Sequence, residues 1–494
     1  MGGAIFNSGA FVIAEDTVFA DNSAGVDGGT IESSFNGRPS FERCQFLRNT
    51  AGSNGGVLST IANESTFKKC RFVNNKAGGQ GGVVRAKSHA LTFEDCYFEG
   101  NSAAEGGVVW SSPNLFQDGK FTQCIFKQNS ASSAGGVASF DSYFFPASAF
   151  EDCIFTENTA PTGGAIITNG SVPSTNCHFE GNTAEEGAAI FFQDTASSHS
   201  LTKCTFDSNI ASENGGAIVM NYMRKNILKE CVFKNNTAVN WGGAIRTRET
   251  TATLTDCKFE ANAADEGGGI RSFDSDITCH GCDFHENSAT SGGSFYTTGN
   301  SGIAVFDGCN FRQNTAETEG GAILAIVEET TISGGSKFEC NEASSGGAIW
   351  QIGGSIDVSD TEFTSNKAQR GGALGLIGTA SSSIDSCLFD QNEATDFGGG
   401  AIMTEERVDP VSVTMSSTVF QNNTSLGQSQ PSDDIYDSDN TLMINCGANY
   451  DNCFCDADGN SSPNVTTNDL PIICAGAGVG LDCPGCTRTP PISC

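Results

Sequence analysis

Apolar and polar positions alternate in short segments that recur along most of the chain. The recurring unit reads C-x-F-x-x-N-x-A and is followed, after three or four residues, by G-G-A-I. Because Cys and Phe are two residues apart, both side chains lie on the same face of a strand. No segment shows an apolar stripe at helical spacing. The pattern therefore predicts short strands joined by glycine-containing turns.

The unit occurs sixteen times between Phe19 and Phe420, with a mean period of about 27 residues. A fixed period in this range is the signature of a solenoid, and about 27 residues suits three short strands per turn. We predict an all-β fold: a right-handed single-stranded parallel β-helix, a pectin-lyase-like solenoid of about 16 coils. We predict that residues 1–423 form this repeat domain.

Stacking of the coils turns each recurring residue into a column. Equal positions of neighbouring coils lie about 4.8 Å apart, the spacing between strands. We expect the Phe column to form an interior aromatic ladder and the Asn column an amide ladder, in which each side chain bonds to the next. The paired glycines allow a positive φ and close contact between coils.

A cysteine precedes the ladder Phe by two residues in twelve units. One interpretation is a metal or redox stack; the other is a ladder of small hydrophobic residues packed beside Phe. Because a structural metal needs ligands that converge on one point, and a column offers one per coil, we favour packing. Some neighbours are close enough for disulfides to form. The column comprises Cys44, Cys70, Cys96, Cys124, Cys153, Cys177, Cys204, Cys231, Cys257, Cys282, Cys309 and Cys387.

The repeat ends near Asn423. Residues 424–445, rich in Ser, Gln and Asp, are predicted to be a polar linker. Residues 446–494 contain seven cysteines and are predicted to be a Cys-rich tail, either a disulfide-stapled cap or the start of a further module. Insertions interrupt the period at Ser139–Ala149 and Tyr222–Asn226. In a solenoid such loops usually lie along one side and form the binding face.

The composition limits the partners. There are 58 acidic and 26 basic residues, a net charge of −32. Such a surface repels a phosphate backbone, which argues against nucleic acid, although it could collect divalent cations diffusely. The chain has no run of 18 apolar residues, so no transmembrane segment is predicted. The chain opens inside a repeat unit without a secretory signal, so we expect a truncated sequence whose targeting signal has been lost.

The acidic residues and the histidines are the candidates for catalytic chemistry. Lyases and hydrolases on this fold need carboxylates that converge with a basic residue. Acidic pairs occur at Glu94-Asp95, Glu151-Asp152, Asp274 with Asp276, and Asp433-Asp434, on different coils. The histidines form no spacing motif and are expected at the surface: His89, His178, His199, His280 and His285. We therefore predict no catalytic, cofactor-binding or metal-binding residues, and a protein that is not an enzyme.

The alternation of G-G-A-I with F-x-x-N between Gly2 and Asn423 resembles the repeat of chlamydial polymorphic outer-membrane proteins. This resemblance implies a β-helical passenger at a cell surface, with a role in adhesion. The expected function is a cell-surface or secreted β-helix, located in the outer membrane if bacterial, that acts as an adhesive or structural spacer for glycans or proteins. The alternative is a polysaccharide lyase or hydrolase on the same fold.

Overall fold

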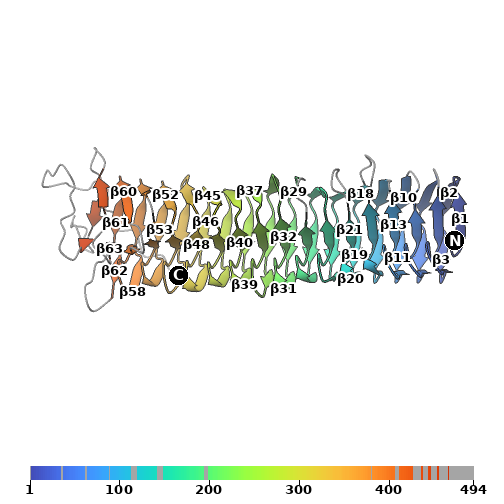
Figure 1. Ribbon diagram of the computed structural model, residues 1–494, viewed down its shortest axis with the longest axis horizontal. Helices are drawn as coiled ribbons and strands as arrows, with labels where there is room; N and C mark the ends of the chain where they lie inside the picture. Colours follow the sequence, from blue (N-terminus) through green and yellow to red (C-terminus); the bar gives the residue numbers. More distant parts are fainter. Residues whose placement is uncertain are drawn as a thin grey trace. The chain divides into compact units, whose positions relative to one another are not determined.

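The computed structural model describes residues 2–34, 37–61, 64–87, 90–112, 119–141, 148–193, 198–379, 381–405, 411–426, 435–437, 443–446, 453–455 and 465–466. The chain divides into two compact units, Met1–Ala252 and Thr253–Cys494. Each unit is a stack of β-coils without helices in its described residues, and the strand labels follow Figure 1.

The coils of the first unit contribute strands to four parallel ladders, except that the fourth ladder is reduced to isolated bridges at Thr159 and Thr162. The first coil supplies β1 (Ile5–Ser8), β2 (Phe11–Glu15), β3 (Val18–Ala20) and β4 (Ser23–Ala24). The corresponding strands of the second coil are β5 (Ile31–Ser34), β6 (Arg38–Glu42), β7 (Gln45–Leu47) and β8 (Thr50–Ala51). The ladders of this unit end at β36 (Ile245–Arg248), β33 (Asn226–Lys229), β34 (Val232–Lys234) and β35 (Thr237–Ala238).

The second unit repeats the same arrangement. Its ladders include, early in the unit, β40 (Ile270–Phe273), β41 (Asp276–His280), β38 (Lys258–Glu260) and β39 (Ala263–Glu266). The four ladders continue to β59 (Ile402–Glu405), β60 (Ser412–Ser416), β61 (Val419–Gln421) and β62 (Thr424–Ser425). The predicted all-β parallel solenoid is therefore confirmed.

The number of strands per coil differs from the prediction of three. The segment after the ladder Asn also pairs between coils, with Thr50 opposite Ser23 and Ala51 opposite Ala24. It forms a short fourth ladder because its Ala points inward in successive coils while the preceding Asn fixes the register. Four strands rather than three surround the interior.

The interior contains the predicted aromatic ladder and a second one beside it. Phe46 and Phe72, of the third ladder, stack with ring centroids 5.0 Å apart and planes 3° apart. Phe67, of the second ladder, meets Phe72 edge-on at 5.3 Å and 74°. Both geometries are favourable for aromatic pairs: stacking joins neighbouring coils, and the edge-on contact joins the two columns within a coil.

The Asn column forms the predicted amide ladder. Asn101 is fully buried, and its Nδ2 donates hydrogen bonds to Oδ1 of Asn129 (2.9 Å) and to the carbonyl oxygen of Phe72 (3.0 Å). Its Oδ1 accepts from the backbone N–H and from Nδ2 of Asn75. The buried amides therefore satisfy one another and the backbone at the corner.

Two corners of the coil use left-handed backbone without requiring glycine. The residue before the Cys position has a positive φ, as in Lys69 (51°), and so does the residue before the ladder Asn, as in Asn74 (55°). The Gly-Gly turn is more restrictive. A Cβ on Gly107 would lie 2.1 Å from the carbonyl oxygen of Gly136, so glycine lets these backbones approach closely; Ala188 takes the equivalent position in another coil, where the N–H···O distance is longer, 3.4 Å against 3.0 Å.

Strand pairing continues beyond Asn423. Strands β63 (Ile435–Asp437), β64 (Met443–Cys446) and β65 (Cys453–Cys455) pair with β59, β60 and β61, and β66 (Val465–Thr466) pairs with β63. The predicted linker and tail thus contribute strands to the ladders. Their remaining residues lie outside the described ranges, and the boundaries between the three predicted segments stay predictions.

Candidate functional site

The acidic pairs weighed from the sequence do not converge. Glu94 forms an ion pair with Lys68 of the preceding coil (3.0 Å), and Glu151 forms one with Lys120 (3.0 Å). Asp274 accepts hydrogen bonds from the backbone N–H groups at residues 300 and 301. Asp433-Asp434 lies outside the described residues. These carboxylates hold neighbouring coils or turns together and do not form a shared acid–base site.

Of the five histidines, two lie at the surface, His285 is partly buried, and His89 lies outside the described residues. His178 lies 3.3 Å from Glu180, and His280 lies 3.1 Å from Asp307, at the surface. His199, however, is 2% exposed and packs against the ring of Phe192. The surface expectation was wrong for His199 because it precedes β29 (Ser200–Thr202) at an inward-facing position, the one that Asn226 occupies in the next coil.

The Cys column is a buried packing ladder. All twelve of its members are free thiols, and each is at most 3% exposed. The Sγ of Cys96 contacts the carbonyl oxygens of Glu94 and Phe67 at 3.4 Å, which suits a weak S–H donor. Burial raises the pKa of the Cys124 thiol, and it raises the pKa of Cys387 to about 12. Cys124 and Cys387 therefore remain protonated at neutral pH and are poor nucleophiles.

Metal binding finds no support in the described ranges. There, no group of three or more His, Cys, Asp or Glu side chains lies close enough together to hold a metal ion. In the same residues, no helix has the length and hydropathy of a membrane span.

Cys340 lies outside the Cys column and differs from the free thiols of the column, because it is disulfide-bonded.

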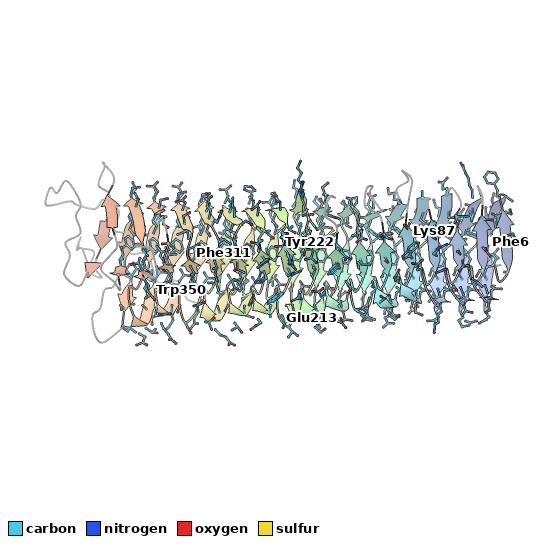
Figure 2. The ribbon with its side chains drawn as sticks, viewed as in Figure 1. Phe6, Lys87, Glu213, Tyr222, Phe311 and Trp350 are labelled. Atoms are coloured by element: carbon cyan, nitrogen blue, oxygen red, sulfur yellow. The ribbon has the colours of Figure 1, made fainter. Side chains whose placement is uncertain are left out.

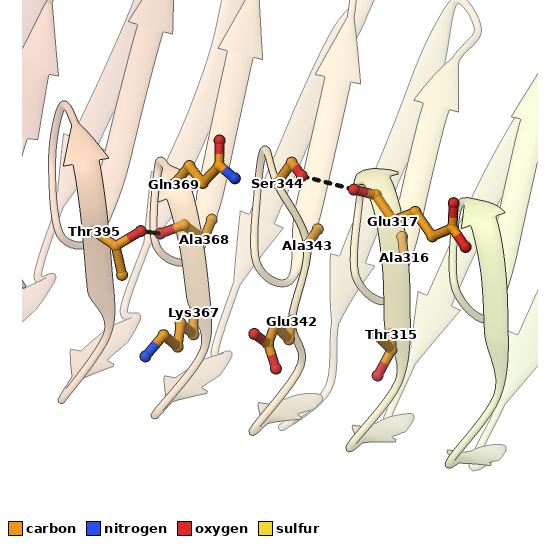
Figure 3. A pocket seen from close by; sticks show the side chains of 10 residues that line it. All are labelled: Thr315, Ala316, Glu317, Glu342, Ala343, Ser344, Lys367, Ala368, Gln369 and Thr395. Carbon is orange, nitrogen blue, oxygen red and sulfur yellow. Dashed lines mark hydrogen bonds between the residues drawn. The ribbon is translucent and has the colours of Figure 1, made fainter.

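A shallow groove of about 280 Å³ crosses the fourth ladder of the second unit (Figure 3). It forms where the short side chains of Ala343 and Ser344 lie between the longer Glu317 and Gln369 of the adjacent coils. The Ser344 hydroxyl donates to the carbonyl oxygen of Glu317 at 2.6 Å. The lining is Thr315, Ala316, Glu317, Glu342, Ala343, Ser344, Lys367, Ala368, Gln369 and Thr395.

A second surface lies on the first unit, around the insertion at Tyr222–Asn226, and we call it the basic patch. It begins where β32 (Ile218–Asn221) ends, and Figure 2 labels Tyr222 there. The side chains of Arg224 and Lys225 are exposed. The patch comprises Tyr222, Arg224, Lys225, Trp241 and Arg248, together with Arg246, which is only 9% exposed.

The aromatic rings of the basic patch each lie beside a guanidinium group. The Arg248 guanidinium carbon is 5.3 Å from the ring centroid of Tyr222, and that of Arg246 is 5.8 Å from Trp241. Arg246 also donates a hydrogen bond to Oδ1 of Asn221 in the preceding coil. Cation–π contact and this hydrogen bond hold the cations in defined positions on the outer face of β36.

Sequence reasoning located the insertion but not the patch. Arg246 follows the inward Ile of the G-G-A-I motif, at a position that the alternation of a strand turns outward. Trp241 directly precedes the paired glycines. The sequence signal for the patch lies in the residues that flank G-G-A-I, compared from unit to unit. The same comparison shows that Trp110 and Trp350 occupy the position of Arg246 in their own coils.

The stacked parallel coils, with inward Phe and Asn columns, define the protein as a single-chain parallel β-solenoid. The family model described as right handed beta helix region matches residues 1–119, 31–184 and 163–335, which together cover more than half of the chain. The chain belongs to the right-handed β-helix family. A comparison with curated proteins gave no match.

Proposed function

We propose that this protein is a non-enzymatic cell-surface or secreted β-helix that acts as an adhesive or structural spacer. One observation carries the proposal: the interior is built from the same few residues in successive coils, whereas the outward positions differ from coil to coil. The exposed position that holds Arg71, for example, holds Gln45 in the preceding coil. A constant frame with a variable exterior suits display of binding residues, because an outward change leaves the frame intact.

The outward charges also support a mechanical role. Arg43 contacts Glu15 and Asp16 of the preceding coil, and Arg48 contacts Asp21 at 2.7 Å. Hydrogen bonds from these guanidiniums hold the pKa of Asp16 and of Asp21 below the usual range of a carboxyl. Such ion pairs link successive coils rather than forming a reactive site, although each exposed pair contributes little to stability alone.

An extracellular or cell-surface location is part of the proposal. The disulfide at Cys340 supports it, because disulfides persist in oxidising compartments. Mass spectrometry of the protein isolated from its native source, alkylated without reductant, tests this point. We expect Cys340 to resist alkylation; a fully reduced Cys340 would argue for a reducing compartment.

The function itself is tested by a glycan array run in parallel with a reducing-end assay on acidic polysaccharides. Binding without cleavage is the expected result. New reducing ends would overturn the non-enzymatic proposal and direct attention to the groove of Figure 3, where Glu317, Glu342 and Lys367 lie on three neighbouring coils. If neither glycan binding nor new reducing ends are detected, the protein is a structural spacer without a glycan ligand.

A further inference from the structure

We propose that the basic patch binds an anionic polysaccharide, through carboxylate or sulfate groups on its sugars, without cleaving it. This inference rests on the proposed adhesive function and names the ligand class and the surface. It is carried by three properties of the patch: its local charge, the anchoring of its loop and its exposed aromatic rings.

The local charge is opposite to that of the chain. Acidic residues outnumber basic ones by 58 to 26 overall. Residues 221–229 and 241–248 nevertheless contain five cations and no Asp or Glu: Arg224, Lys225, Lys229, Arg246 and Arg248. Two acidic side chains lie at the margin, since Arg248 is 3.6 Å from Glu249 and Lys229 is 3.6 Å from Glu230. The cations are thus concentrated on a surface where a polyanion is attracted locally.

The loop that presents Arg224 and Lys225 is anchored on both sides. Met223 is 1% exposed, and its carbonyl oxygen accepts a hydrogen bond from the backbone N–H of Thr251 at 2.9 Å. Asn226 is also 1% exposed, and its Nδ2 donates to the carbonyl oxygen of Thr251 at 3.0 Å. Two exposed cations therefore lie between two buried anchors. Such preorganisation lowers the entropy lost when a ligand binds.

Tyr222 and Lys225 give the loop its shape. Both have left-handed backbone, with φ of 59° and 61°. The Tyr222 N–H donates to the carbonyl oxygen of Arg248 at 2.8 Å, which joins the loop directly to β36. Neither Arg224 nor Lys225 forms an ion pair with a described residue, so both cations can meet an external anion.

The aromatic rings favour a sugar chain over other polyanions. Tyr222 is 39% exposed and Trp241 is 37% exposed, each beside a guanidinium. An aromatic face can pack against the apolar face of a pyranose ring while the Arg248 guanidinium, which is 43% exposed, forms paired hydrogen bonds with a carboxylate or sulfate.

The test measures binding of the full chain to alginate and heparin oligosaccharides by biolayer interferometry at several salt concentrations. We expect the double variant R224A/K225A to weaken binding at least tenfold and to reduce its salt dependence. The charge-preserving variant R224K/K225R should retain most of the affinity. The matched control is R43A/R48A, which also removes two outward arginines, and it should bind like the unaltered protein.

Each outcome decides the proposal. Unaltered affinity in R224A/K225A, no binding of either polyanion by the starting protein, or tighter binding of single-stranded DNA of equal charge would overturn it. Circular dichroism and melting temperature verify that the variants are folded. If the glycan array shows neutral glycans bound while alginate and heparin are not, this inference fails although the proposed adhesive function stands.

Discussion

Replacement of Asn101 by Ala tests how much of the stability depends on the amide ladder. The side chain takes part in four hydrogen bonds, two donated by Nδ2 and two accepted by Oδ1, and it is fully buried. A buried hydrogen bond contributes about 0.5–1.5 kcal/mol net, and a buried group left without a partner costs about 1–3 kcal/mol. The change also orphans the backbone N–H of Asn75, which water cannot reach.

We therefore expect N101A to lower the free energy of unfolding by about 4 kcal/mol. Urea denaturation followed by circular dichroism measures the loss, and S102A, an adjacent change at an outward position, should stay within about 0.5 kcal/mol of the parent. Because a solenoid opens locally, hydrogen exchange should accelerate most in peptides between Asn75 and Asn129. A loss below about 1 kcal/mol would show that the amides are not a main source of coil cohesion.

Other consequences can be measured in the same way. Replacing the stacked, fully buried Phe126 with Ala should cost about 3–5 kcal/mol, and a smaller loss would show that the ladder repacks. Replacing Gly107 with Ala should lower the melting temperature sharply, whereas Gly25→Ala should not, because a Cβ there meets nothing within 4 Å; equal effects would contradict the close-contact argument. Since burial raises the pKa of Cys387 to about 12, the folded protein at pH 8 should resist iodoacetamide at this thiol, and rapid labelling would refute that burial.

The frame of the fold was predictable because its residues repeat. An inward Asn or Phe must be the same in successive coils to continue a ladder, so its column is visible in the sequence alone. The second aromatic column was missed because it is incomplete: Phe150 is followed in its ladder by Ser174 and then by Leu201. A position that only has to fill space admits several side chains, and its periodicity is lost.

The basic patch could not be predicted for a different reason. Tyr222 and Arg248 are 26 residues apart, and they meet because the insertion after β32 brings Tyr222 beside the adjacent coil. The repeat gives the register of the fixed columns but not the path of an inserted loop. His199 illustrates the same limit, since one step of register decides whether a side chain faces the core or the solvent.

The left-handed corners restrict how this surface can evolve. Their side chains face solvent, where most substitutions are normally neutral, yet a β-branched residue is strained at a positive φ. Within the described ranges, the non-glycine residues with positive φ include Arg, Lys, Asp, Asn, Glu, Gln, Ser and Ala but no Val, Ile or Thr. Codon changes that introduce those three residues should therefore be selected against at two exposed sites in each coil. Substitutions that change the charge are tolerated at these sites, whereas substitutions that introduce a β-branched side chain are not.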